Sequence, residues 1–183
     1  MRPVIVWVVA AIATMILAAF PAAAAQTGLT EEAIKAFYKQ SADSHKRSFQ
    51  DYVSFMTRAM ADEFTMTDTA TILMEGKPPT VTKNRETKLS FLAHVKVAYD
   101  GLKGAEITET VKKTEIAADG KSAKVFEEET VRNISFRIGG GGQYFGNGKG
   151  ECEDEVVLSD SGQIQVSKSV CKSRIFVSKG QSL

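Results

Sequence analysis

The stretch ECEDEVVLSDSGQIQVSKSVCK, residues 151–172, holds both cysteines of the 183-residue chain. Its Ser161-Gly162 dipeptide predicts a tight turn between two antiparallel strands. With a two-residue turn, Cys152 and Cys171 face each other directly, and opposite charges that face each other on both sides support this register. These charge pairs are Glu151 with Lys172 and Glu155 with Lys168. A three-residue loop with Gly162 in the left-handed region would instead leave the cysteines diagonal.

In either register we expect a structural disulfide between the two cysteines. It would close a loop of about 20 residues and stabilise the fold by about 3 kcal/mol. A redox-active thiol pair and a metal site are the alternatives. However, the chain has no Cys-x-x-Cys motif, and its two histidines, His45 and His94, lie far from the cysteines in sequence. The sequence therefore predicts no metal site and no cofactor.

The N-terminus, MRPVIVWVVAAIATMILAAFPAAAAQ, is typical of a secretory signal peptide. One charged residue precedes an apolar run that ends at Phe20, and Pro21 and four alanines follow. Ala23 and Ala25 stand where the signal peptidase requires small side chains, so residues 1–25 would be removed. The alternative is an uncleaved membrane anchor, although the apolar run of 17 residues is short for a span of about 20. We expect an exported protein, periplasmic or secreted, in a compartment that favours disulfides.

Removal of residues 1–25 leaves 158 residues, the length of one ordinary domain. Arg2 is the only charged residue in the removed segment, so 22 basic residues remain against 22 acidic residues. This balance gives no electrostatic attraction to nucleic acid. We expect a single domain over residues 26–183 that binds no nucleic acid and that contacts a membrane only if the N-terminal segment is retained.

The first half of the mature chain has helical patterns. Two capping patterns predict two helices, over 29–47 and 48–62, or one long helix with a bend. Residues 64–74, FTMTDTATILM, are rich in threonine and β-branched residues, which predicts a strand or a strand-like turn. Apolar residues at helical spacing predict a third helix over 84–102.

From residue 106 the hydrophobic period changes to two, and an Asp119-Gly120 turn joins two predicted strands. Two pairs of opposite charge would face each other across this hairpin: Glu115 with Lys124, and Lys112 with Glu127. The run 127–129, three glutamates, is expected to be a solvated segment that meets lysines across the sheet. An acidic cation site is disfavoured there, because adjacent strand residues point to opposite faces.

Residues 139–150, GGGGQYFGNGKG, do not match a phosphate-binding loop. Gly150 stands where a Walker loop needs Ser or Thr, and both flanking segments are predicted strands. We therefore expect a mobile hairpin loop. Tyr144 and Phe145 near its tip would cover a pocket or contact a partner.

The order of these elements resembles the nuclear transport factor 2-like superfamily, which includes SnoaL-like and ketosteroid isomerase-like proteins. The segments MADEFTMTD and KLSFLAHVKVAYDGL and the two C-terminal hairpins carry the resemblance. The resemblance implies an α+β cone, in which a strongly curved antiparallel sheet packs on N-terminal helices and encloses a pocket. Members of the superfamily often dimerise through the outer face of the sheet, so the resemblance allows a homodimer, although no surface patch in the sequence predicts one.

Enzymes of this superfamily place an Asp or a His inside the cone as a general base. The candidates here are Asp62, Asp68 and His94. None of them stands in a spacing that matches a catalytic signature of the superfamily, so no catalytic role is carried over. Most aromatic residues of the helical half are expected in the core, and some of them would line a ligand pocket. The candidate pocket residues are Phe37, Tyr52, Phe55, Phe64, Phe91 and Tyr99.

Three functions fit these patterns. The first is an exported module that binds a small apolar ligand or a protein partner without catalysis. The second is an isomerase or dehydratase of the SnoaL or ketosteroid isomerase kind, which needs a carboxylate or histidine with a perturbed pKa in the cavity. The third is an envelope scaffold subunit anchored by residues 4–20.

Mass spectrometry of the exported protein distinguishes cleavage from anchoring. We expect the mass of residues 26–183, because the alanine tract fits the signal peptidase site. A mass that includes residues 1–25 would instead favour the membrane-anchored scaffold.

Overall fold

The computed structural model describes residues 28–137 and 143–180, and within them the chain forms three helices and six strands. In chain order they are α1 (Glu31–Ser44), α2 (Phe49–Ala59), β1 (Met60–Met74), β2 (Thr80–Thr87), α3 (Lys88–Leu102), β3 (Glu106–Ile116), β4 (Ser122–Arg137), β5 (Gln143–Leu158) and β6 (Ile164–Lys179). No helix in the described ranges is long and apolar enough to cross a membrane. The predicted signal peptide, residues 1–25, lies outside them.

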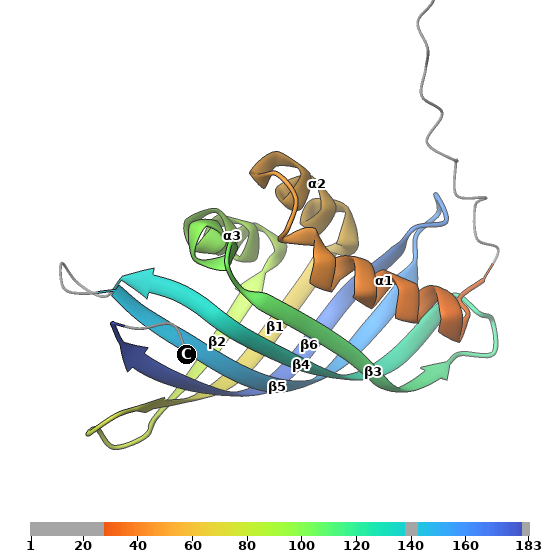
Figure 1. The fold of residues 1–183 in the computed structure, drawn as a ribbon. Helices are drawn as coiled ribbons and strands as arrows, with labels where there is room; N and C mark the ends of the chain where they lie inside the picture. Colours follow the sequence, from red (N-terminus) through yellow and green to blue (C-terminus); the bar gives the residue numbers. More distant parts are fainter. Residues whose placement is uncertain (1–27, 138–142, 181–183) are drawn as a thin grey trace, which may run out of the picture.

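The six strands form one curved sheet in the order β2-β1-β6-β5-β4-β3, and the helices lie against one face of it (Figure 1). The predicted α+β class, with helices packed on a curved sheet, is confirmed. The four long strands predicted to be antiparallel, β3 to β6, pair in that way, and β1 joins this sheet by pairing with β6 in parallel. Their parallel pairing brings the helical half of the chain onto the cysteine hairpin.

Strand β2 is absent from the sequence-based prediction, which began the third helix at residue 84. The helix begins at Lys88, after a capping box in which Thr87 and Ser90 bond each other's backbone N–H groups. Residues 80–87 pair with β1 instead, and most of them are exposed. An exposed edge strand has no apolar alternation, so the sequence carries no period-two signal for it.

The predicted mobile loop over residues 139–150 is wrong for its described part. Residues 143–150 form the first half of β5 and pair with β4 on one side and β6 on the other. Tyr144 and Phe145 therefore lie within a strand and not at a loop tip. Glycines carry no side chains that could alternate, so this half of the strand gave no signal. Residues 138–142 lie outside the described residues.

Bulges set the registers of both hairpins. The cysteine turn has the three-residue form, with Gly162 at φ 75°, which alone would leave the cysteines diagonal. An extra residue in β6, Ser167, shifts the pairing back by one. Cys152 therefore faces Cys171 with their Cα atoms 4.1 Å apart, and the predicted disulfide forms.

A second bulge lies in β3, where Lys112 has no partner in the ladder. The predicted facing of Glu115 and Lys124 is confirmed, because these residues lie between the hairpin turn and the bulge. The predicted facing of Lys112 and Glu127 is wrong, because beyond the bulge Val111 takes the place opposite Glu127. Lys112 instead lies 3.7 Å from the carboxylate of Glu128.

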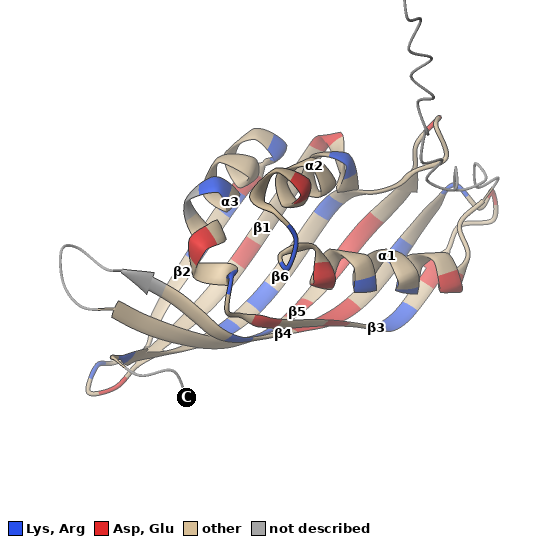
Figure 2. Cartoon of the chain, turned by 45° about the horizontal axis from the view of Figure 1, so that its top comes forward, with Lys and Arg blue, Asp and Glu red and all other residues tan. Residues whose placement is uncertain are grey.

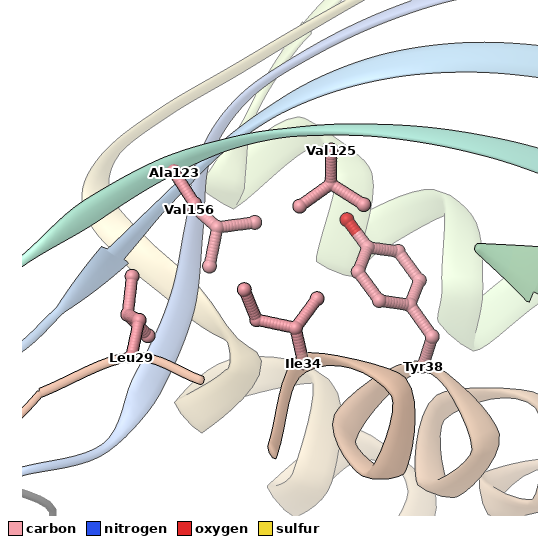
Figure 3. Packing of buried hydrophobic residues seen from close by; sticks show 6 residues of the cluster. All are labelled: Leu29, Ile34, Tyr38, Ala123, Val125 and Val156. Atoms are coloured by element: carbon pink, nitrogen blue, oxygen red, sulfur yellow. The ribbon is translucent and has the colours of Figure 1, made fainter. Parts of the chain in front are cut away.

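The main core lies between α1 and the sheet. Side chains of α1 project toward β4 and β5 (Figure 3), and this buried cluster comprises Leu29, Ile34, Tyr38, Ala123, Val125 and Val156. A second cluster joins α2 and α3 through Tyr52, Val95 and Tyr99. Burial of a large apolar side chain stabilises a fold by about 1.5–3 kcal/mol, so these clusters hold the helices on the sheet.

The end of α3 approaches β4 so closely that only glycine fits. A Cβ atom at Gly101 would lie 2.1 Å from the carbonyl oxygen of Ser135, whereas one at Gly104 would meet nothing within 4 Å. We expect Gly101→Ala to lower the free energy of unfolding by about 1–3 kcal/mol, as overpacking does. Gly104→Ala is the matched control. Urea unfolding measures both variants, and equal stabilities would contradict this packing.

Candidate functional site

A cavity of about 260 Å³ lies between the helices and the concave face of the sheet. Its apolar walls come mainly from the helices and β1, and they include Phe37, Tyr52, Met56, Met60, Phe64, Met66 and Phe91. The Cys152–Cys171 disulfide forms part of the opposite side. A larger hollow of about 330 Å³ beside Leu73 and Phe176 has no buried titratable group among its described lining residues. The chemistry therefore points to the first cavity.

Four acidic residues on three neighbouring strands line the sheet side of this cavity: Glu109 on β3, Glu127 and Glu129 on β4, and Asp154 on β5. Alternate strand residues share a face, so Glu127 and Glu129 both point inward, and Glu109 faces Glu129 across the ladder. Figure 2 shows acidic positions on neighbouring strands beneath the helices. None of the described lining residues is a lysine or an arginine.

Burial raises the pKa of every carboxyl group in this cluster. The pKa of Glu127 is about 9 and that of Glu109 about 8, first because burial disfavours the charged form and then because neighbouring carboxylates repel a further negative charge. Burial also raises the pKa of Glu129 and of Asp154. At neutral pH Glu109 and Glu127 therefore hold their protons.

The hydrogen bonds of the cluster come from α1. The hydroxyl of Tyr38 donates to Asp154 Oδ2 at 2.5 Å, and the hydroxyl of Ser41 donates to Glu109 Oε1 at 3.1 Å. Burial beside Asp154 raises the pKa of Tyr38 well above its ordinary value, so this hydroxyl keeps its proton. Among the described residues, Oε2 of Glu109 and Oε2 of Glu127 have no hydrogen-bond partner although they are buried. Oδ1 of Asp154 is likewise buried without a partner. Three carboxyl oxygen atoms thus remain for a ligand.

His45 also lines the cavity and is 2% exposed. Its Nδ1 lies 2.7 Å from the carbonyl oxygen of Ala42, and its Nε2 lies 2.9 Å from that of Ala105. A ring nitrogen must carry hydrogen to bond a carbonyl oxygen, so the ring can satisfy both only when both nitrogens are protonated. The imidazole joins the end of α1 to the start of β3 and fixes one wall of the cavity.

The structure places four of the six predicted pocket residues in the cavity lining: Phe37, Tyr52, Phe64 and Phe91. Phe55 lies outside the lining and packs against Phe37, with ring centroids 6.2 Å apart. Tyr99 packs against Tyr52 at 5.6 Å, and its hydroxyl donates to the carbonyl oxygen of Arg47. Both therefore support the wall from outside.

None of the three candidate catalytic residues lines the cavity. Asp62 is fully exposed and lies 2.9 Å from the ammonium group of Lys88. The side chain of His94 is 71% exposed, with Nδ1 3.1 Å from the carboxylate of Glu86. Asp68 is partly buried on β1 and accepts a hydrogen bond from Ser173. Burial raises its pKa, and its charge in turn raises the pKa of Glu129.

Sequence reasoning missed the acidic cluster. The glutamate run was predicted to be solvated, and this is wrong for two of its members, because only Glu128 pairs with outer-face lysines. A signal was present: Glu127 and Glu129 share the parity of the apolar residues Val125 and Val131, so they belong to the buried face. Asp154 likewise shares the parity of Cys152 and Val156.

No group of three or more His, Cys, Asp or Glu side chains in the described ranges is arranged to hold a metal ion. The acidic cluster lies along the cavity and does not converge on one point. The chemical capacity of the site thus consists of buried carboxyl groups, two hydroxyl-to-carboxyl hydrogen bonds and aromatic walls.

The raised pKa values predict a pH-dependent stability. Between about pH 5 and pH 9 the folded protein holds protons that the unfolded chain has lost, so the free energy of unfolding falls as pH rises through this window, by up to about 1.4 kcal/mol per pH unit for each proton. We expect Glu127→Gln to make this slope shallower, because it removes one such group. Glu128→Gln, on the opposite face of the same strand, should leave the slope unchanged. Urea unfolding at several pH values measures both, and equal slopes would contradict the assignment.

No protein-family model matches the sequence, and no curated protein matches it. A putative scytalone dehydratase from Novosphingobium aromaticivorans superposes with a TM-score of 0.55 at 8% identity, over 83% of this chain and 88% of that chain. LinA superposes with a TM-score of 0.52 at 11% identity, over 83% and 90%. A ketosteroid isomerase-like protein from Erwinia carotovora atroseptica gives 0.42 at 12% identity, over 79% and 98%. A structural likeness at such low sequence identity establishes the fold alone. The chain has the predicted nuclear transport factor 2-like cone fold.

Proposed function

We propose that this protein binds a small organic molecule in the cavity between its helices and the concave face of its sheet. The observation that carries the proposal is a cavity of about 260 Å³ with aromatic walls and three buried carboxyl oxygen atoms that have no partner among the described residues. Sites for small molecules combine apolar walls with a few placed polar groups. The cavity has this composition.

The volume of the cavity limits the size of the ligand. A cavity of about 150 Å³ suffices for benzene, and drug-sized ligands occupy about 300–1,000 Å³. At about 260 Å³ this cavity fits a single ring with a short substituent. The ligand is therefore a small metabolite-sized molecule in this proposal.

We place this binding outside the cytosol. The disulfide supports export, because such bonds persist in oxidising compartments. The signal-peptide pattern over residues 1–25 supports it from the sequence. In this proposal the mature domain spans residues 26–183 and acts in the periplasm or in the medium.

Acid–base catalysis is the second candidate function. Glu109 and Glu127 favour it, because their pKa values of about 8 and 9 lie close enough to neutrality for proton transfer. Asp154, held by the Tyr38 hydroxyl, offers a further carboxyl group in the same cavity. This candidate would make the protein an isomerase or dehydratase. A catalyst converts its bound molecule, so time-dependent new ligand signals would separate catalysis from binding.

The methionines of the mature chain provide a test with an internal control. Met56, Met60 and Met66 line the cavity, whereas Met74 lies beside the other hollow. With methyl-labelled methionine, we expect single-ring ligands to shift the NMR signals of the three cavity methyl groups and to leave Met74 unchanged. A screen of single-ring compounds in which no ligand moves these three signals, or in which Met74 moves equally, would contradict the proposal.

A further inference from the structure

The acidic side chains on the two faces of the sheet have different neighbours. On the outer face the carboxylates lie beside lysines, as in the pairs Glu128 with Lys149 at 2.8 Å, Glu155 with Lys168 at 2.8 Å and Glu153 with Lys124 at 3.3 Å. On the inner face four carboxyl groups line the cavity, and no described lining residue is a lysine or an arginine. The fold thus gathers acidic groups around a cavity whose one basic side chain among the described residues, His45, bonds the carbonyl oxygens of Ala42 and Ala105.

A second observation points to a ligand at these groups. Glu127 is 9% exposed and lines the cavity, and its Oε2 atom has no hydrogen-bond partner among the described residues. Oε2 of Glu109 is in the same condition. Buried polar atoms in native proteins are nearly always hydrogen-bonded, and an exception calls for an explanation. A bound donor would supply the missing bonds.

We infer that the cavity binds a small organic cation, a protonated amine that carries one ring or a short apolar chain. Its N–H groups would donate to Glu109 and Glu127, and its apolar body would lie against Phe37, Tyr52 and Phe91. This inference rests on the proposed ligand-binding function and names the chemical class of the ligand.

The arrangement of the acidic groups and the aromatic walls of the cavity favour an amine over a metal ion. The described acidic side chains do not form a metal-binding arrangement, whereas an ammonium group needs only two or three separate acceptors for its N–H donors. Aromatic rings attract an ammonium group through their negative faces, and the opposite wall supplies such rings in Phe37, Tyr52, Phe64 and Phe91. An ammonium group with an apolar body would satisfy both sides of the cavity at once.

Binding of a cation would release a proton. The titratable groups that surround Glu127 in the cavity are Glu129 on β4, Glu109 on β3, Asp154 on β5, Tyr38 and His45 on α1, and Tyr52 on α2. The pKa of Glu127 is about 9 without a ligand, so an entering ammonium group would form an ion pair as the carboxyl proton passes to solvent. Affinity should therefore rise up to about tenfold per pH unit between about pH 6 and pH 8, while an ordinary amine stays protonated.

The test compares benzylamine with benzyl alcohol, which has nearly the same shape and no charge. We expect benzylamine to bind at least tenfold more tightly at pH 8, to shift the Met56, Met60 and Met66 methyl signals, and to lose this advantage in Glu127→Gln. Glu128→Gln on the outer face is the matched control and should bind like the wild type. Calorimetry of the wild type in two buffers of different ionisation enthalpy should detect proton release, which gives a readout even if Glu127→Gln fails to fold.

The outcomes separate the inference from the proposed function. If benzyl alcohol binds as tightly as benzylamine and shifts the same three methyl signals, the cation inference is overturned and the proposed function stands. Benzylamine binding without proton release, or binding unchanged in a folded Glu127→Gln, would also overturn the inference. If neither compound shifts the cavity methyl signals, the inference fails, and the wider screen of single-ring compounds decides the proposed function.

Discussion

The alternation of side chains along β4 and β5 is the constraint on which the rest of this structure depends. It sends Glu127 and Glu129 into the cavity and Glu128 to the outer face beside Lys149. A shift of one residue in the strand pairing would send each of these side chains to the other face. The bulge at Lys112 sets the register in which β3 pairs with β4. The raised pKa values, the acceptors without partners and the proposed ligand class all follow from which face each carboxyl group occupies.

Much of the fold could be predicted because its signals are local. Caps mark the helices, and the turn at Gly120 and the charges around the cysteines mark two hairpins. The rest had no local signal. The edge strand β2 lacks apolar alternation, the glycines at the start of β5 lack side chains, and the bulges at Lys112 and Ser167 shift registers that turn chemistry alone would set otherwise.

The site was less predictable than the fold. The aromatic residues of the helical half were candidates for a pocket, and four of them line the cavity, among them Phe37 and Tyr52. The acidic cluster escaped because three consecutive glutamates usually lie in solvent, and only their parity with Val125 marks two of them as buried. Burial of Glu109 depends on the curvature of the sheet and on cover by α1, which contributes Ser41 to it. Contacts between segments so far apart in the sequence cannot be predicted from a short stretch of it.

Direct titration of the carboxyl groups tests the central claim, that the concave face holds protonated acids. In protein labelled with ¹³C at the glutamate carboxyl groups, the NMR shifts report each ionisation separately. The account predicts that Glu109 and Glu127 stay protonated beyond pH 7, while Glu128, beside Lys149, ionises below its ordinary pKa. Titration of Glu109 and Glu127 near the ordinary glutamate value of about 4.3 would contradict it.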